Sequence, residues 1–293
     1  MSFAVMTDSS ANLPGELVKK YDLSVIPFHY YVNGEGFTCV DSESFDAESF
    51  YQQIREGLVV NTSLVSPQEY EDFFEKPLSE GKDVLYVGMS SGISGSYNSS
   101  RLAAEAMRKK YPSRRIEVLD TLGASLGEGL IVLRAALCRD SGLSLSDTLA
   151  QLREHIINMF QVFTVDDLMH LRRTGRLSNL SAVIGTVLRI KPLLKGDPEG
   201  KIVAFGKIRS RRKTIEAIAA RYDQLVVRPM EQIIGIAQAG CREDAAYLAE
   251  LLRKNHPPKE ILTVQYEPVT GSHVGPGALA LFFEGAPGVR ETV

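Results

Sequence analysis

The stretch YVGMSSGISGSYNSSRLAAEA, residues 86–106, combines three patterns that decide how this chain folds. An apolar run ends at Met89, serines and glycines dominate positions 90–100, and a strong helix-forming sequence follows. This order predicts a strand that passes through a hydroxyl-rich loop into a helix. Free N–H groups at a helix N-terminus favour an anion, and serine hydroxyls add further donors. We therefore expect this loop to bind an anionic ligand rather than to hold only capping serines.

Two further loops repeat this arrangement in the first half of the chain. TDSS (7–10) follows the apolar run FAVMT, and LGASLGEG (122–129) follows RIEVLDT. Short β-branched runs, including one at 23–32, alternate here with helical patterns, which predicts a parallel sheet covered by helices on both faces. Parallel strands place the loops that follow them at one edge of a sheet, so we expect the three loops to form a ligand site there.

The second half of the chain has a different pattern of expected strands and helices. Strands are expected at 161–165, 201–208, 232–240, 261–269 and 278–285, and helices at 178–188, 210–228 and 242–256. A long helical region at 123–159, interrupted at 140–147, precedes them. The chain is long enough for two domains. We predict an N-terminal α/β domain at 1–158 and a C-terminal α/β domain at 159–293.

Composition excludes several classes of protein. The chain has 293 residues and a net charge of −3, which argues against a general nucleic-acid-binding protein. Three widely separated cysteines favour neither disulfides nor a zinc site and fit a cytoplasmic location. No leader is expected, and no apolar run approaches the roughly 18 residues that span a bilayer. Phosphate-binding glycine motifs and a cluster of metal-ligating residues are both absent from the sequence, so neither a nucleotide cofactor nor a metal is expected.

Polar features elsewhere complete the list of candidates. NTSLVSP (61–67) is a polar turn before a helix that begins with Ser66 as N-cap and Pro67 at its first position. A basic turn that ends at Arg176 leads into an apolar segment, which is typical of a buried helix or of a cavity wall. KIRSRRK (207–213) concentrates five positive charges that are either solvated or dock an acidic partner. His273 lies in a Gly/Pro-rich stretch that we expect to be a positioned loop.

These pieces together resemble the DegV family, which includes the fatty-acid-binding subunits of bacterial fatty acid kinase. The motifs TDSS, TSLVSP, SSGISGSYNS, LDTLGASLGEG, LRRTGRLS, IKPLL and HVGPGALAL occur in the family's order and approximate spacing. The resemblance implies a two-domain α/β protein with an N-terminal parallel sheet and a C-terminal mixed sheet. It also implies a long-chain fatty acid between the domains, presented to a separate ATP-dependent kinase that makes acyl phosphate.

The resemblance also assigns roles to individual residues. Thr62 and Ser94, with their neighbours Ser63 and Gly95, would hold the carboxylate. Arg176 and His273 would complete the polar network, and the tail would occupy an apolar tunnel. The kinase partner would dock at the basic stretch, on Arg209 or Arg211, with Arg212 as a further candidate. The family often has two glycines before the arginine, where this chain has Thr174-Gly175. These roles describe a carrier with no cofactor and no catalysis of its own.

Three alternatives belong to other classes. GASLG (123–127) matches the nucleophile elbow of α/β-hydrolases, and Asp166 and His273 follow Ser125 in the order of a catalytic triad. A phosphotransferase resembling dihydroxyacetone kinases is a second possibility, although no nucleotide motif supports it. A regulatory sensor that reaches nucleic acid through its basic stretch is the third, and the net negative charge disfavours it.

Overall fold

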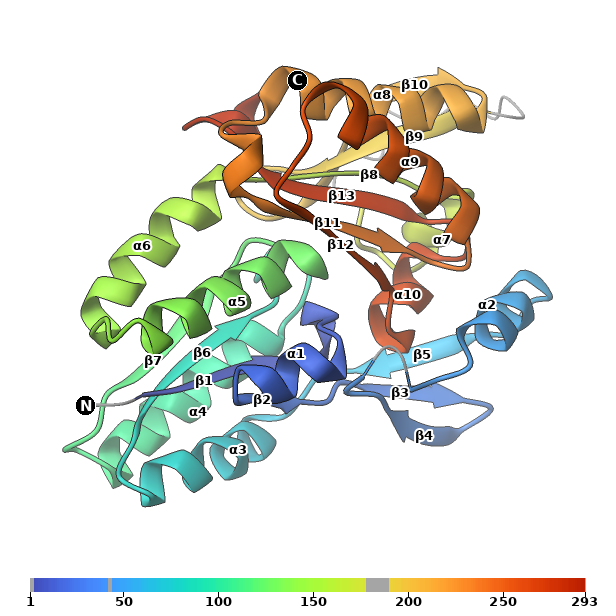
Figure 1. Ribbon diagram of the computed structural model, residues 1–293. Coiled ribbons are helices and arrows are strands. Elements are labelled where there is room, and N and C mark those ends of the chain that lie inside the picture. Colours follow the sequence, from blue (N-terminus) through green and yellow to red (C-terminus); the bar gives the residue numbers. More distant parts are fainter. Residues whose placement is uncertain (1–2, 42–43, 178–189, 293) are drawn as a thin grey trace.

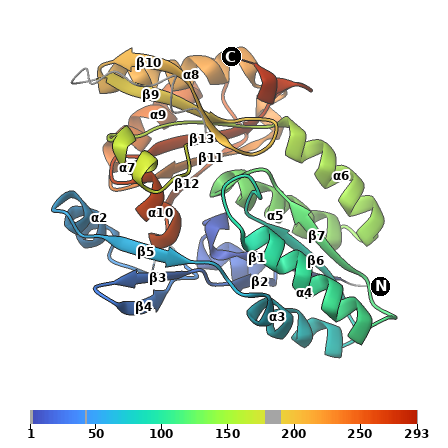
Figure 2. The same ribbon diagram turned by 180° about the vertical axis from the view of Figure 1, so that it is seen from behind.

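The computed structural model describes residues 3–41, 44–177 and 190–292. Two sheets lie one above the other with helices around and between them (Figures 1 and 2). The helix expected at 178–188 lies outside the described residues. Within those residues, no helix is both long enough and apolar enough to cross a membrane.

The first sheet is parallel and has the strand order β2-β1-β6-β7. Its strands are β1 (Phe3–Asp8), β2 (Leu23–Ile26), β6 (Asp83–Gly88) and β7 (Ile116–Asp120). The helices of this half are α1 (Gly15–Lys20), α2 (Ala47–Arg55), α3 (Pro67–Ser79), α4 (Ser96–Lys110), α5 (Leu126–Asp140) and α6 (Leu145–Asn158), with a 3-10 turn η1 (Ser9–Ala11). Side chains alternate along β6: Val84 and Tyr86 pack in a core with α3 and α4, whereas Leu85 and Val87 face α5.

The second sheet is mixed and has the order β10-β9-β8-β13-β11-β12. Its strands are β8 (Met159–Thr164), β9 (Ile190–Gly196), β10 (Ile202–Arg209), β11 (Ile233–Gln238), β12 (Glu260–Gln265) and β13 (Leu279–Glu284). The remaining helices are α7 (Leu168–Arg173), α8 (Arg211–Leu225), α9 (Arg242–Asn255) and α10 (Pro268–Val274), with 3-10 turns η3 (Pro229–Glu231) and η4 (Val289–Glu291). A parallel sheet and a separate mixed sheet confirm the predicted fold class. The domain limits at 158/159 stay a prediction.

A small third sheet was not expected from the sequence. It has the order β4-β3-β5 and consists of β3 (His29–Val32), β4 (Glu35–Thr38) and β5 (Val60–Ser63). The single strand predicted at 23–32 is wrong, because the chain leaves the first sheet after Ile26 and starts β3 at His29. Pro27 separates the two strands, and proline has no N–H to donate to a strand ladder. The next N–H, that of Phe28, donates to Ser9 Oγ at 3.0 Å.

Helix α5 is apolar nearly all round because it lies between the two large sheets. One side packs on β1 and β6, and the other meets β8, β11 and β13. Two glycines permit this close approach. A Cβ at Gly129 would lie 2.4 Å from the carbonyl oxygen of Ala11, and one at Gly235 in β11 would lie 2.7 Å from Leu126 Cβ. The spacing between the sheets therefore depends on the absence of side chains at both positions.

We expect Gly235→Ala to destabilise the protein by about 1–3 kcal/mol, because the new methyl group must push β11 away from α5. Urea unfolding followed by circular dichroism measures the change. Gly206→Ala in β10 is the matched control, since a Cβ there first meets the flexible Leu193 side chain at 3.3 Å. Equal stability of the two variants would show that the contact between β11 and α5 tolerates extra volume.

Candidate ligand site between the sheets

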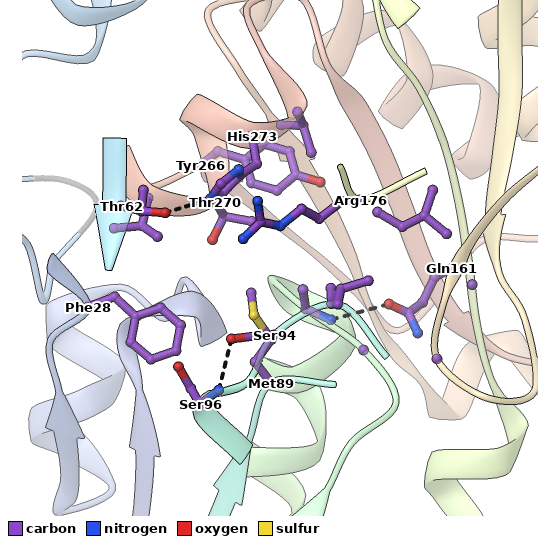
Figure 3. A pocket seen from close by; sticks show the side chains of 18 of the residues that line it. Phe28, Thr62, Met89, Ser94, Ser96, Gln161, Arg176, Tyr266, Thr270 and His273 are labelled. Atoms are coloured by element: carbon purple, nitrogen blue, oxygen red, sulfur yellow. Dashed lines mark hydrogen bonds between the residues drawn. The ribbon is translucent and has the colours of Figure 1, made fainter. Parts of the chain in front are cut away.

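A cavity lies between the loops of the first sheet and the inner face of the second (Figure 3). Its apolar walls include Phe28, Met89, Ile93, Phe163, Ile202 and Phe282. The volume open to the centre of a water-sized sphere is about 190 Å³, whereas a single water needs only about 10–15 Å³ by that measure. The cavity is therefore large enough for an organic ligand of many atoms.

The serine-rich loop divides its hydroxyls between structure and cavity. Ser90 is buried and donates to the carbonyl oxygen of Gly200 at 2.8 Å, which joins this loop to the turn between β9 and β10. Ser94 and Ser96 line the cavity. Ser94 Oγ accepts the backbone N–H of Ser96 at 3.2 Å, so its own hydrogen remains available to a ligand. Gly95, at the N-terminus of α4, is adjacent to the cavity but does not line it.

Thr62 and His273 meet across the cavity from elements far apart in the sequence (Figure 3). Thr62 Oγ1 and His273 Nε2 are 2.9 Å apart. Thr62 lies in β5, opposite Tyr30 of β3, and not in the polar turn that the sequence predicted. The alternation of a strand explains why Thr62 is half-buried while its neighbours Asn61 and Ser63 are exposed; Ser63 still borders the cavity.

His273 belongs to helix α10, so the prediction of a Gly/Pro loop at this position is wrong. The strand expected at 261–269 ends at Gln265, and α10 begins at Pro268. The side chain of Glu267 caps this helix by accepting the N–H groups of Val269 and Thr270, both at 2.6 Å. A capping residue followed by proline at the first helical position is a start signal that the sequence analysis missed.

Burial makes His273 neutral at physiological pH. Desolvation, followed by the neighbouring Arg176 and His170, lowers the pKa of His273 to about 4. Its Nδ1 atom is buried and has no hydrogen-bond partner among the residues that the structure describes. An unpaired buried nitrogen is costly in the absence of a ligand or water.

Arg176 supplies the permanent positive charge at this end of the cavity. It is half-buried, and desolvation lowers the pKa of its guanidinium from the ordinary value. Nη1 donates to the carbonyl oxygen of Thr174, and within the described part of the chain Arg176 makes no ion pair. Among the described residues that line the cavity there is no Asp or Glu. An arginine without a counter-ion, beside neutral hydroxyls, suits an anion.

The hydroxyls of the TDSS loop do not reach the cavity, so our expectation that this loop contributes ligand donors is wrong. Thr7 and Ser10 donate to Glu128 of α5 at 2.9 and 2.6 Å. Asp8 accepts the Tyr86 hydroxyl at 2.7 Å and the N–H of Met89 at 3.3 Å. Burial raises the pKa of both carboxyl groups, and that of Glu128 is raised further by Asp8. The loop forms a buried network beneath the site instead.

The structure does not join Ser125, His273 and Asp166 into the catalytic triad of the hydrolase alternative. Ser125 has the positive φ of 55° that a nucleophile elbow requires, but its side chain is almost completely buried. His273 faces Thr62, and Asp166 pairs with Lys191 at 2.7 Å and Arg211 at 3.7 Å. No hydrogen bond joins Ser125 to His273 in the described residues.

The three arginines of the basic stretch differ in their surroundings. Arg211 is largely buried and pairs with Asp244 at 2.8 Å, so its charge is already neutralised within the protein. Arg212 is exposed, pairs with Glu216 at 3.4 Å and stacks over the ring of Tyr247. Arg209 is exposed at the end of β10, and no ion pair involves it within the described ranges. Docking of a partner on these residues stays a prediction.

The structure thus brings five of the six predicted ligand-site residues to one cavity: Thr62, Ser63, Ser94, Arg176 and His273. Their role in binding stays a prediction. The sequence analysis missed Phe28, Gln161, Tyr266 and Thr270, which also line it. These side chains come from the broken run at 23–32, from β8 and from the start of α10. Only the proline start signal of α10 could have been detected.

The fold is that of an α/β protein with two large sheets and a small third sheet, and the cavity between the large sheets combines apolar walls with polar side chains. Comparison with known proteins identifies its relatives: residues 2–286 match the family model described as "Uncharacterised protein, DegV family". The chain belongs to the DegV family. It is 38% identical to a DegV domain-containing protein of Clostridium perfringens, over 97% of both chains.

Two solved structures share the whole fold. One, described as showing fatty acid binding of a DegV family protein from Thermus thermophilus, has a TM-score of 0.88 and 30% sequence identity, and the match covers 98% of this chain and 100% of the other. The other, DegV from Bacillus subtilis, described as a fatty acid binding protein, has a TM-score of 0.84 and 30% identity with the same coverage.

We expect His273 to stay neutral down to about pH 4, which ¹⁵N NMR of its imidazole measures. The unfolded chain, with a histidine pKa of about 6.5, binds the proton more tightly than the folded protein. Stability should therefore rise with pH between about 4 and 6.5 and be unaffected by this group above that range. The full effect is about 3 kcal/mol at about 1.4 kcal/mol per tenfold change in proton affinity. His273→Gln should lose this pH dependence; an unchanged profile would place the imidazole in water.

Proposed function

We propose that this protein binds a long-chain fatty acid in the cavity between its sheets. The observation that carries the proposal is the mixed character of the cavity: most of its walls are apolar, while Thr62, Arg176 and His273 lie near one another in the upper part of Figure 3 and Ser94 lies below them. A fatty acid has the same mixed character. Its tail gains about 0.8 kcal/mol for each buried methylene, and its carboxylate needs donors.

The polar side chains can hydrogen-bond a carboxylate through neutral hydroxyl groups, in addition to the positive charge of Arg176. The hydroxyl of Ser94 is free to donate. Thr62 can donate as well when His273 carries its proton on Nε2, because that N–H then donates to Thr62 Oγ1. Arg176, which makes no ion pair with the residues that the structure describes, balances the charge of the anion. The relatives from Thermus thermophilus and Bacillus subtilis, whose descriptions state fatty acid binding, support this assignment.

The protein is in our proposal a cytoplasmic carrier without a cofactor, and it performs no catalysis itself. It presents the carboxylate to an ATP-dependent fatty acid kinase, which forms the acyl phosphate. Two observations support this part. His273 and Asp166 of the hydrolase alternative have other partners, and Thr62, Arg176 and His273 also border a second cleft that is open to solvent. A carboxylate held by these residues would be within reach of a partner enzyme.

We expect Thr62→Ala combined with Ser94→Ala to weaken binding of palmitate, because each lost hydrogen bond to a charged group costs about 1.5–3 kcal/mol. Isothermal titration calorimetry measures the affinity, and mass spectrometry of an organic extract measures the acid that co-purifies. Ser99→Ala combined with Ser100→Ala is the matched control, since these serines lie in α4 outside the cavity lining. Wild-type affinity of the first variant would refute the head-group assignment.

Arg209→Glu should leave the content of fatty acid unchanged but reduce acyl-phosphate formation by the fatty acid kinase of the same organism. Charge complementarity controls encounter more than ligand affinity, so the loss should be largest at low salt. A coupled phosphorylation assay with pre-loaded protein measures turnover. Arg153→Glu, an exposed arginine on α6, is the control. Equal turnover of both variants would remove Arg209 from the docking surface.

A further inference from the structure

A second cleft lies on the outer side of the same polar residues. Its lining includes Asn61, Thr62, His170, Arg173, Arg176 and His273. Three of these, Thr62, Arg176 and His273, also line the inner cavity, so the polar end of the cavity forms a wall shared with the cleft. The cleft has a volume of about 590 Å³ and opens to solvent. Any group attached to the outer side of a carboxylate held by these residues would enter it.

The charged side chains in the described lining of this cleft are positive. Arg173 and Arg176 line it, and no Asp or Glu belongs to the part of the lining that the described residues form. Asp167 is the acidic neighbour, with an oxygen 3.8 Å from Arg173 Nη2. Both side chains of that pair are more than half exposed, so the attraction is weak and a ligand can compete with it.

Arg173 is oriented by His170. His170 Nε2 faces the backbone carbonyl oxygen of Ser272, which can only accept a hydrogen bond, so Nε2 carries the proton. In the tautomer with this single ring proton, Nδ1 is an acceptor, and Arg173 Nη2 can donate to it at 3.3 Å. The Arg173 side chain is 65% exposed, so this contact orients the guanidinium without immobilising it and leaves its other N–H groups available. The planar guanidinium of arginine recognises the oxygens of a phosphate well.

We propose that the outer cleft binds the phosphoryl group of an acyl phosphate, with Arg173 and Arg176 as its ligands. The inference rests on the proposed function and names the site of its product. In the reaction, a carboxylate oxygen of the bound acid attacks the terminal phosphorus of the ATP held by the kinase. A phosphorus–oxygen bond forms, the bond to the departing ADP oxygen breaks with its electron pair, and no oxidation occurs. The transferred group stays in the cleft, covalently joined to the acid in the cavity.

The test compares two ligands with the same tail. One is palmitate, and the other is a long-chain 2-oxoalkyl phosphonate, in which a methylene replaces the bridging oxygen of the acyl phosphate. Arg173→Gln should weaken the phosphonate about tenfold and palmitate less than twofold, because Arg173 lines the cleft but not the cavity. Arg172→Gln is the matched control: it removes the same charge from the same helix, at a residue that lines neither site. It should change neither affinity by more than twofold.

The outcomes separate this inference from the proposed function. Phosphonate affinity of Arg173→Gln within twofold of the wild type, or an equal loss for both ligands, would overturn the phosphoryl site. Titration with inorganic phosphate, followed by ³¹P NMR, tests the cleft without any tail. If palmitate fails to bind but phosphate binds and loses affinity in Arg173→Gln, the fatty-acid proposal falls and the anion cleft stands. If palmitate binds but phosphate produces the same small response in wild type and variant, the cleft is not an anion site.

Discussion

The packing of α5 between two sheets is the constraint on which the rest of this structure depends. Leu126, Ile131 and Val132 are fully buried on this helix, and burial of such a side chain contributes about 1.5–3 kcal/mol. The contact is close because glycine occupies position 129 on the helix and position 235 on β11. It holds the carboxyl edge of the parallel sheet against the inner face of the mixed sheet. The loops at this edge do not fill the space between the two sheets, and the cavity is the part that remains open.

The same helix controls the loops through a buried polar network. Glu128 on α5 accepts hydrogen bonds from Thr7 and Ser10, and Asp8 between them accepts the N–H of Met89 at the start of the serine-rich loop. Desolvation raises the pKa of Glu128 and Asp8, so burial opposes negative charge beneath the proposed anion site. A half-satisfied network of this kind would be costly, whereas a satisfied one fixes a single arrangement. We regard this network as the reason why the loop is preorganised before any ligand arrives.

The two sides of the polar wall have different chemistry. The cavity side offers neutral hydroxyls and one arginine, which suits a single negative charge beside an apolar tail. The outer side adds Arg173, which suits the greater charge of a phosphoryl group. His273 remains neutral between them because it is buried near Arg176. A neutral imidazole can exchange donor and acceptor roles with Thr62 without a change in net charge.

The sequence by itself determined the class of fold, the parallel character of the first sheet and the helix that begins at Pro67 after its N-cap Ser66. The five residues that meet at the cavity followed from the resemblance of its motifs to those of a family. These features depend on local periodicity, on capping residues and on motifs in a fixed order, all of which can be seen along the chain. The sequence did not show the break at Pro27, the small third sheet or the helical setting of His273. Tertiary structure decided these, because short strands and short helices gain their stability from contacts with distant segments. It also decided that the TDSS hydroxyls turn inward to Glu128, 118 residues away from Ser10, while Ser94 faces the cavity. Hydroxyl-rich loops look alike in sequence, and only the position of a buried carboxyl group on α5 distinguishes a loop that supports the site from one that lines it.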